Sequence, residues 1–230
     1  MRIPATILAD IEGTTTPISF VHETLFPYAH ARLDGFLALH AHEPEIQAAF
    51  AELAEIAPGA PPVETLRALM DIDAKVAPLK TIQGLIWAEG YAKRELKGAL
   101  YTDVPPAFRL WSNAGLDLNI YSSGSRAAQQ LLFRHSVAGD LTILIRQYFD
   151  TRIGGKRESQ SYLAIADALQ TSPADILFLS DVELELDAAA QAGLQVCQLV
   201  READGTQACA QHPSVPDFDK VAALFGLPRL

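Results

Sequence analysis

The sequence is poor in the features that mark several classes of protein. Only two of its 230 residues are cysteines, Cys197 and Cys209, and their spacing does not suit a metal site, so we expect reduced thiols. The first apolar run stops at Asp10, too early for a signal peptide, and no run approaches the ~20 residues of a membrane-spanning helix. These absences predict a cytoplasmic protein with no membrane partner.

Basic residues are also scarce. Lysine and arginine number 18 against 28 acidic residues, for a formal net charge of −10. Because a nucleic-acid-binding surface needs a basic stripe, we expect no nucleic-acid partner. A small anionic substrate stays open, because a few local cations and a metal can outweigh a distant field. We find no long apolar face that demands a partner, and therefore expect a monomer.

The stretch from Thr6 to Thr16 organises the chain. Its first four residues, Thr6-Ile7-Leu8-Ala9, are typical of a strand buried on both faces of a parallel sheet. Asp10 and Glu12 follow, then a glycine and three threonines. Ligands of open α/β sheets bind beyond the carboxyl ends of the strands. Two carboxylates there indicate a cation site, a nucleophile with an acid/base partner, or both, although a capped polar turn would look similar.

The rest of the chain separates into a helical block and an alternation of strands and helices. Nothing between about 20 and 100 resembles a strand, and apolar spacing predicts helices over 25–40, 45–56, 63–72 and 79–96. Further strands are expected over 116–121, 147–149, 176–179 and 196–200, helices over 104–114, 126–134, 158–169, 184–191 and 218–225, and a surface loop over 199–212. This order predicts an α/β fold with a doubly wound parallel sheet, in which 1–19 and 101–230 form the catalytic core and 20–100 an inserted helical cap.

Four strand ends together supply groups for phosphoryl transfer. Asp10 is the candidate nucleophile, and Glu12 can exchange a proton with a leaving oxygen. Ser122 or Ser123, beside a glycine at a helix start, offers a hydroxyl and amide groups to phosphate oxygens. Each feature alone has an ordinary structural explanation, and their order along one sheet edge is what favours a site.

A lysine and a third acid complete this set. Lys156 follows a Gly-Gly pair and adds a cation, while Asp181, helped by Glu183 or Glu185, offers a second hard ligand for Mg²⁺. Two carboxylates and a phosphate dianion bring four negative charges together, of which Mg²⁺ and Lys156 neutralise three. We therefore expect both cations to be needed.

These motifs resemble the haloacid dehalogenase superfamily of aspartyl-phosphate phosphatases, and most closely its enolase-phosphatases of methionine salvage, the acireductone synthases. Superfamily phosphatases usually carry Asp-x-Asp-x-Thr, and a Glu in the second acidic position, as in Asp10-Ile11-Glu12-Gly13-Thr14, is similar to the enolase-phosphatase form. The likeness continues in 83–91, 121–125, 148–156, 178–181 and 185–189. Arg94 and the stretch 201–205 depart from the family pattern.

The resemblance implies a substrate, a metal and a division of roles. The substrate would be 2,3-diketo-5-methylthiopentyl-1-phosphate, which is enolised and then dephosphorylated to the acireductone 1,2-dihydroxy-3-keto-5-methylthiopentene. Asp10 and Asp181, with Glu12 through its main-chain carbonyl, would hold Mg²⁺. Asp10 would be the nucleophile and the Glu12 side chain the proton shuttle, while Ser122, Ser123 and Lys156 bind substrate.

Three alternatives stay open at this point. A magnesium-dependent phosphatase of the same superfamily, acting on another small phosphate ester, keeps every role except enolisation. A metal-free dehalogenase has little need of Glu12 or Asp181. A phospho-accepting signalling domain would be shorter and would lack the helical cap. Within that cap, Phe20, Trp87 and Tyr91 are candidates for contact with the methylthio group, although Trp87 and Tyr91 are better explained as cap core.

Overall fold

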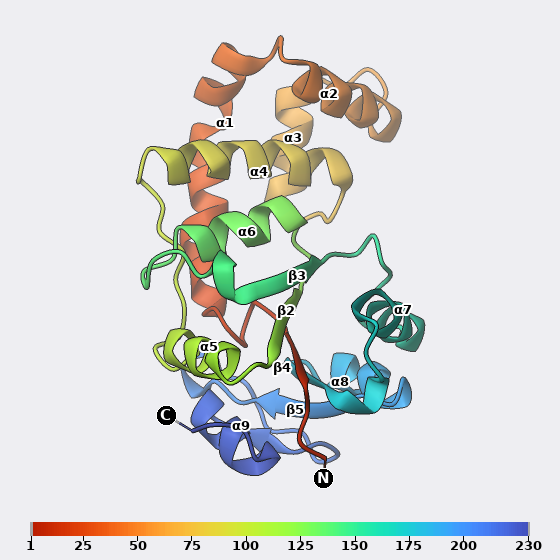
Figure 1. Ribbon diagram of the computed structural model, residues 1–230. Helices are drawn as coiled ribbons and strands as arrows, with labels where there is room; N and C mark the ends of the chain where they lie inside the picture. Colours follow the sequence, from red (N-terminus) through yellow and green to blue (C-terminus); the bar gives the residue numbers. More distant parts are fainter. Residues whose placement is uncertain (1, 230) are drawn as a thin grey trace. The chain divides into compact units, whose positions relative to one another are not determined.

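The computed structural model describes residues 2–229 and consists of two compact units (Figure 1). One unit comprises Met1–Ile18 and Gly98–Leu230, and contains the whole sheet. The other, Ser19–Lys97, is helical. That this second unit acts as a cap stays a prediction. None of the described helices is long and apolar enough to cross a membrane.

The first unit is built on a six-stranded parallel sheet with the strand order β3-β2-β1-β4-β5-β6. The chain therefore proceeds from β1 towards one edge, and later returns beside β1 and proceeds towards the other. This reversal confirms the doubly wound α/β fold. The strands are β1 (Thr6–Ala9), β2 (Asp117–Tyr121), β3 (Ile145–Phe149), β4 (Ile176–Ser180), β5 (Gln195–Leu199) and β6 (Ser214–Val215).

The register of the sheet aligns the polar strand ends. Ala9 of β1 lies level with Ile120 of β2 and with Leu179 of β4. Asp10 therefore lies level with the last residues of both neighbouring strands, which are about 4.8 Å away on either side. Polar residues that follow β1, β2 and β4 consequently meet at one edge of the sheet.

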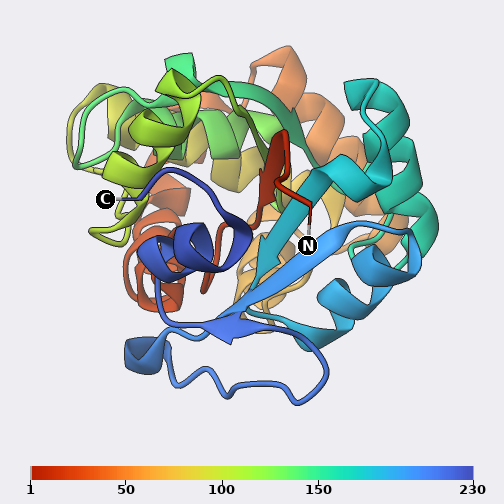
Figure 2. The same cartoon turned by 60° about the horizontal axis from the view of Figure 1, so that its bottom comes forward.

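Helices cover both faces of this sheet. On one face the Phe218 ring of α9 (Phe218–Phe225) packs against Phe108 and Trp111 of α5 (Val104–Asn113), and Phe108 also stacks on Phe133 of α6 (Arg126–Arg134). On the other face, α7 (Ser159–Leu169) and α8 (Glu183–Gln191) enclose a core cluster with β4 and β5. Figure 2 shows α8 and α9 on opposite sides of β4 and β5.

The helical unit contains no strand, as the sequence predicted for this described stretch. A π-helical turn, η1 (Phe20–Leu25), leads into α1 (Phe26–His40), α2 (Pro44–Ile56), α3 (Pro62–Asp71) and α4 (Ala77–Ala92). Its apolar cluster includes Leu33, Ile46, Leu66 and Ile82, all of them fully buried. Trp87 donates its indole N–H to the Leu25 carbonyl at 2.8 Å, which fits a structural role inside this unit.

Most predicted boundaries lie within two residues of the observed ones, and a few elements differ more. The helix predicted over 79–96 ends at Ala92, because Arg94 takes a left-handed conformation (φ +61°) and the Glu95 N–H bonds back to the Gly90 carbonyl. The strand predicted over 147–149 begins two residues earlier. The short strand β6 was not predicted, because a run of two residues shows no periodicity. The predicted loop 199–212 contains a turn of 3₁₀ helix, η4 (Glu202–Asp204). Two further such turns, η2 (Thr142–Leu144) and η3 (Pro173–Asp175), lead into β3 and β4.

Candidate active site

Asp10 lies at the carboxyl end of β1, in the middle of the sheet, and is only 4% exposed. Its Oδ1 atom accepts a hydrogen bond from the Ile11 N–H at 2.7 Å and lies 2.7 Å from the Lys156 Nζ. Charge-assisted contacts of this kind fix the orientation of a carboxylate. Both contacts use the same oxygen, which leaves Oδ2 as the oxygen of Asp10 available to a substrate.

Lys156 reaches Asp10 from the loop that follows β3. Its Nζ lies 2.7 Å from Asp10 and 2.6 Å from Glu185 Oε2. Burial by itself lowers the pKa of the Lys156 ammonium, but attraction to Asp10 and Glu185 outweighs it and the pKa is raised. Lys156 therefore stays charged at neutral pH. Two of its three N–H groups are taken by these carboxylates and the third is available for a phosphate oxygen.

The loop that carries Lys156 is fixed from two sides. The Tyr162 hydroxyl donates to the Lys156 carbonyl at 2.6 Å, and the Tyr121 hydroxyl to the Gly154 carbonyl at 2.9 Å. Gly154 has a φ of +139°, and a Cβ at this position would collide with the Ser161 hydroxyl. The Gly-Gly pair before the lysine is thus required by the path of the backbone, and this path aims the ammonium at the end of β1.

Asp181, directly after β4, supplies a carboxylate with one unsatisfied oxygen. Its Oδ1 is buried and has no hydrogen-bond partner among the described residues. Gly13 packs so closely that a Cβ there would collide with this carboxylate. Burial, and then the charge of Asp10, raise the pKa of Asp181 to about 7. A buried, unsatisfied carboxylate next to a second one is costly unless a cation joins them.

These groups fit the divalent metal that the sequence predicts at this edge of the sheet. Asp10, Asp181 and Glu185 bring three carboxylates together against one ammonium, an excess of two negative charges. Within residues 2–229, no three acidic, histidine or cysteine side chains form a metal-binding group by themselves. A cation here therefore also needs main-chain or substrate oxygens, which is compatible with the expected contribution of the Glu12 carbonyl.

The remaining predicted residues surround the same edge less closely. Ser122 is buried after β2, and its hydroxyl accepts the Gly124 N–H at 3.3 Å, whereas Ser123 is exposed. Glu12 is half-buried, and its backbone pairs with Thr16 in the turn after β1. The structure thus joins Asp10 and Lys156 by direct contact and places Asp181 beside them. Ser122 and Ser123 belong to the neighbouring strand end, and Glu12 to the turn.

Glu185 has a different place from the one the sequence suggested. The sequence predicts it, or Glu183, as a helper of Asp181 in metal binding, whereas in the structure its carboxylate pairs with Lys156 and accepts a 2.9 Å hydrogen bond from Ser180. Burial, and then Asp10, raise the pKa of Glu185 to about 7. The sequence holds no local signal of this pairing, because Lys156 and Glu185 lie on different elements and far apart in the chain.

Arg201 is a residue near the site that the sequence analysis did not nominate. Its buried guanidinium lies 3.0 Å from Asp103 and donates to the Thr14 carbonyl at 2.8 Å, so it anchors the threonine turn that follows Asp10. The following Asp204 accepts hydrogen bonds from the Ile18 N–H at 3.1 Å and from the Tyr101 hydroxyl. The stretch that departs from the family pattern is therefore tied to the base of the site.

Comparison with known proteins places this geometry in a family. Residues 4–193 match the family model described as haloacid dehalogenase-like hydrolase. Over 98% of the chain and 97% of the relative, it is 61% identical to a protein of Acidiphilium cryptum named Enolase-phosphatase E1. It is 53% identical, over the full length of both chains, to the protein of that name from Granulibacter bethesdensis.

Solved structures show the same fold. The UTR4 protein of Saccharomyces cerevisiae is 32% identical, with a TM-score of 0.77 over 94% of this chain and 99% of that one. CbbY from Rhodobacter sphaeroides, solved in complex with phosphate, is 16% identical with a TM-score of 0.62 over 94% of this chain and 95% of that one, a likeness of fold alone. On these similarities, the chain belongs to the haloacid dehalogenase-like hydrolases and, among them, to the enolase-phosphatase E1 family.

Proposed function

We propose that this enzyme converts 2,3-diketo-5-methylthiopentyl-1-phosphate to 1,2-dihydroxy-3-keto-5-methylthiopentene and phosphate, the acireductone synthase step of methionine salvage. The observation that carries the proposal is the carboxylate of Asp10, held through one oxygen by Lys156 with the other oxygen open. Glu12, in the second acidic position, distinguishes the enolase-phosphatase form from a simple phosphatase. The relatives' shared name, Enolase-phosphatase E1, agrees with both halves of the reaction.

Enolisation comes first and uses Glu12. The proton that leaves is on the carbon that bears the phosphate, next to a ketone, and the Glu12 carboxylate takes it and keeps it for the second step. Solvent supplies the proton that the ketone oxygen gains, and the later hydrolysis of the aspartyl-phosphate returns one proton to solvent. The electron pair of the broken C–H bond becomes the new C=C bond. Glu12 is half-buried, in the turn two residues from Asp10, so a side chain one methylene longer than Asp can serve an atom beyond the phosphate.

Dephosphorylation then uses Asp10. Its Oδ2 attacks phosphorus, the bond between phosphorus and the enol oxygen breaks, and the leaving oxygen takes up a proton from Glu12. Water then hydrolyses the aspartyl-phosphate and regenerates the carboxylate. Lys156 holds Asp10 by Oδ1 and directs its third N–H at a phosphate oxygen, while Ser122 and Ser123 bind the others.

The divalent cation is proposed to be Mg²⁺, held by Asp10, Asp181 and the main-chain carbonyl of Glu12. When bound, it would screen the phosphate charge from the Asp10 carboxylate and polarise the ketone. The unsatisfied Oδ1 of Asp181 supports its place in this set.

The test is an assay with this diketo phosphate ester and Mg²⁺, in which ultraviolet absorbance follows the conjugated enol and phosphate release is measured in parallel. Asp10→Asn should reduce phosphate release by about 10³-fold or more, because the amide is no nucleophile. Glu12→Gln should abolish enol formation. Enol formation at the wild-type rate in Glu12→Gln would refute the shuttle role. Phosphate release from generic esters, with no enol from this compound, would identify a plain phosphatase instead.

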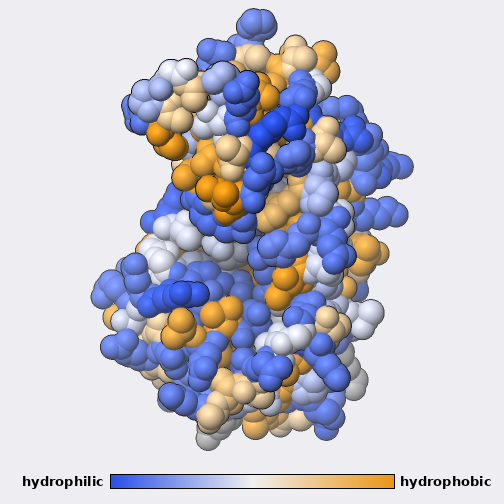
Figure 3. Space-filling model, turned by 180° about the vertical axis from the view of Figure 1, so that it is seen from behind, coloured by the Kyte–Doolittle hydropathy of each residue, from blue (hydrophilic) through white to orange (hydrophobic). Residues whose placement is uncertain are grey.

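We further propose that the enzyme is a cytoplasmic monomer. On the face drawn in Figure 3, hydrophilic side chains predominate and apolar ones are scattered between them. The exposed large apolar side chains, such as Ile3, Leu39 and Ile143, come from separate elements. Sedimentation velocity at micromolar concentration should give a single species near 24.9 kDa.

A further inference from the structure

Helix α6 carries a polar stripe that has no part in the proposed reaction. Arg126, Gln130 and Arg134 follow one another at intervals of four residues, which places them on one face of the helix. Leu132 is buried on the opposite face, and Gln129 and Phe133 are buried between the two. Such a stripe of two guanidiniums and an amide stands out in a chain with a net charge of −10.

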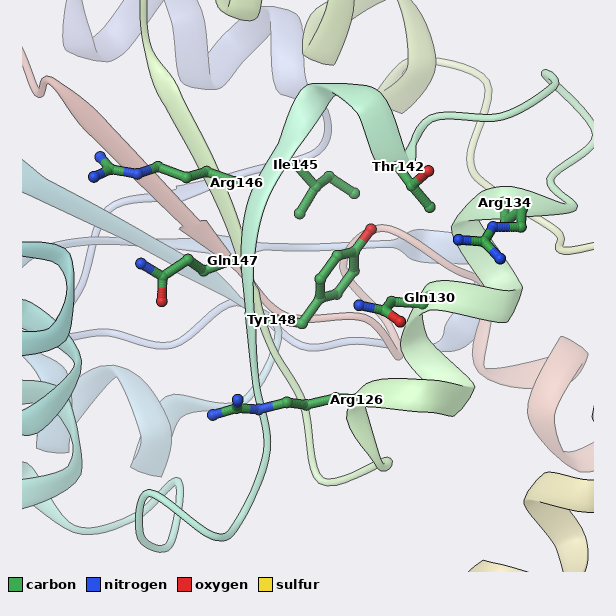
Figure 4. A pocket seen from close by; sticks show the side chains of 8 residues that line it. All are labelled: Arg126, Gln130, Arg134, Thr142, Ile145, Arg146, Gln147 and Tyr148. Carbon is green, nitrogen blue, oxygen red and sulfur yellow. The ribbon is translucent and has the colours of Figure 1, made fainter.

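This stripe lines a pocket of about 320 Å³ against β3, the edge strand of the sheet (Figure 4). A volume of this size is at the lower end of the range for small-molecule sites. The lining residues are Arg126, Gln130, Arg134, Thr142, Ile145, Arg146, Gln147 and Tyr148. All of them belong to the first unit, and none is a residue of the proposed active site.

Tyr148 gives the pocket a buried hydrogen-bonding group without a protein partner. The residue is 8% exposed, and its hydroxyl is hydrogen-bonded to no other described residue. In Figure 4 this hydroxyl points into the space between Thr142, Gln130 and Arg134. Leaving a buried hydroxyl unsatisfied costs about 1–3 kcal/mol. The side chain is thus arranged to donate to something inside the pocket.

The charges around the pocket favour an anion as that occupant. Arg126 and Arg134 form no ion pair within residues 2–229, whereas Arg146 is paired with Asp117 and points away from Tyr148 in Figure 4. Asp140 lies near Arg134, and it accepts hydrogen bonds from the N–H and hydroxyl of Thr142 at 2.9 and 2.6 Å. The Asp150 carboxylate accepts the main-chain N–H of Arg126 at 3.4 Å and forms no ion pair with its guanidinium. Two guanidiniums therefore remain for a ligand.

We propose that the pocket between α6 and β3 is a binding site for a small phosphate-bearing anion. Tyr148, Gln130 and Arg134 hold the phosphate, and Arg126 attracts the rest of the molecule from the far end of the stripe. An arginine fork with an amide and a phenol supplies several donors to one group, which suits the four oxygens of a phosphate better than the two of a carboxylate. The site is independent of the proposed reaction.

Arginine labelling locates binding at this site and separates it from the active site. Phenylglyoxal is applied to the full chain with increasing inorganic phosphate, and the labelling rate of each arginine is followed by peptide mass spectrometry. Arg134 should be protected from labelling. Arg229, an exposed residue outside the pocket that pairs with Asp219, serves as the internal control. Protection of Arg134 that is no greater than that of Arg229 overturns the proposal.

A matched substitution tests the tyrosine. Tyr148→Phe removes one hydroxyl and keeps the ring, and because that hydroxyl has no protein partner the melting temperature should not fall. The phosphate concentration that half-protects Arg134 should rise about tenfold, the loss of one hydrogen bond to a charged group. The concentration at which phosphate inhibits catalysis should stay unchanged, because that effect belongs to the active site.

Three outcomes contradict the proposal. Equal protection of Arg134 in the wild type and in Tyr148→Phe would show that the hydroxyl takes no part. Equal protection by acetate and phosphate at the same concentration and ionic strength would show that the pocket responds to charge alone. A change of the inhibition constant in Tyr148→Phe, with unchanged protection of Arg134, would likewise place the effect at the active site.

Discussion

The two units of this enzyme keep their charged groups in different places. In the sheet-containing unit, the side chains of Lys156 and Arg201 are 9% and 6% exposed and each is paired with carboxylates. In the helical unit, the pairs Arg67–Asp34, Arg32–Glu95 and Lys93–Glu89 all lie at the surface. The interior of the helical unit is instead an apolar cluster.

This difference reflects what each unit has to do. A buried charge costs several kcal/mol of desolvation, which ion pairing and hydrogen bonds only roughly offset, so such pairs are weak stabilisers. Their use at the end of β1 is chemical, because Asp10 needs a partner that holds its carboxylate in a fixed orientation. The helical unit holds no such group in its interior among the described residues, and apolar packing suffices for it.

The largest effect on stability is expected for the buried pair of Lys156. Lys156→Met leaves Asp10 and Glu185 facing each other without a cation, and should lower the free energy of unfolding by about 3–5 kcal/mol. In the double variant Lys156→Met, Glu185→Met, one of the two carboxylates is also removed. The double variant should therefore lose only about half as much free energy of unfolding as Lys156→Met. Urea unfolding at pH 7.5 measures both values.

The double variant also tests whether the network is coupled. If the losses of the two single variants simply add in the double variant, Lys156 and Glu185 do not act as a pair and the contrast between the units weakens. Asp34→Ala with Arg67→Ala is the matched cycle in the helical unit. There we expect a coupling of about 0.5 kcal/mol or less, since both side chains are partly in water.

Arg201 allows a direct comparison of one residue type in two settings. Arg201→Met leaves Asp103 without its ion-pair partner and the Thr14 carbonyl without its donor, and should lower the free energy of unfolding by about 3 kcal/mol. Arg67→Met should change the free energy of unfolding by less than about 1 kcal/mol. Urea unfolding of both variants provides the measurement. Equal losses would show that the exposure of these arginines does not decide how much each stabilises the folded state.

The next effect is a dependence on pH that belongs to the sheet-containing unit. With its pKa raised to about 7, Asp181 in the folded, metal-free chain keeps a proton that the unfolded chain loses near its ordinary value of 3.8. Stability of the metal-free protein should therefore fall as pH rises between about 4 and 7, since the folded state binds more protons there. A divalent cation needs the ionised form, so MgCl₂ should raise the melting temperature more at pH 8 than at pH 6.

Asp181→Asn is the control for this dependence. It should remove most of the difference between the Mg²⁺ effects at pH 6 and pH 8. An equal Mg²⁺ effect at both pH values in the wild type would mean that Asp181 is not a ligand. In the helical unit the direction is opposite, because the hydrogen bond from Lys93 lowers the pKa of Glu89.

The smallest effect should be the same in both units. Arg94 after α4 and Gln170 after α7 both take left-handed conformations, with φ of +61° and +54°, and both are exposed. Glycine adopts this conformation without strain, so Arg94→Gly and Gln170→Gly should each stabilise by about 0.5–1 kcal/mol. Differential scanning calorimetry checks this. A loss in either variant would show that its side chain contributes more than its backbone costs.

Much of the fold was predictable because its signals are local. The all-buried run 6–9, the helix starts and stops, and the alternation of strands and helices follow from periodicities that neighbouring residues carry by themselves. The acids Asp10 and Asp181 and the lysine Lys156 could be nominated for the same reason, because each directly follows a strand or a glycine turn. The two-residue strand β6 and the early end of α4 were missed, since neither leaves a periodic trace.

What the chain alone determined is therefore a doubly wound α/β protein with an inserted helical block and a row of polar strand ends. Tertiary structure decided how those ends combine. The ammonium of Lys156 meets a carboxylate 146 positions away, and Glu185 pairs with it instead of joining Asp181. Arg201 is likewise drawn inward to Thr14. Such pairings depend on sheet register and on the exclusion of water, and a sequence records neither of them locally.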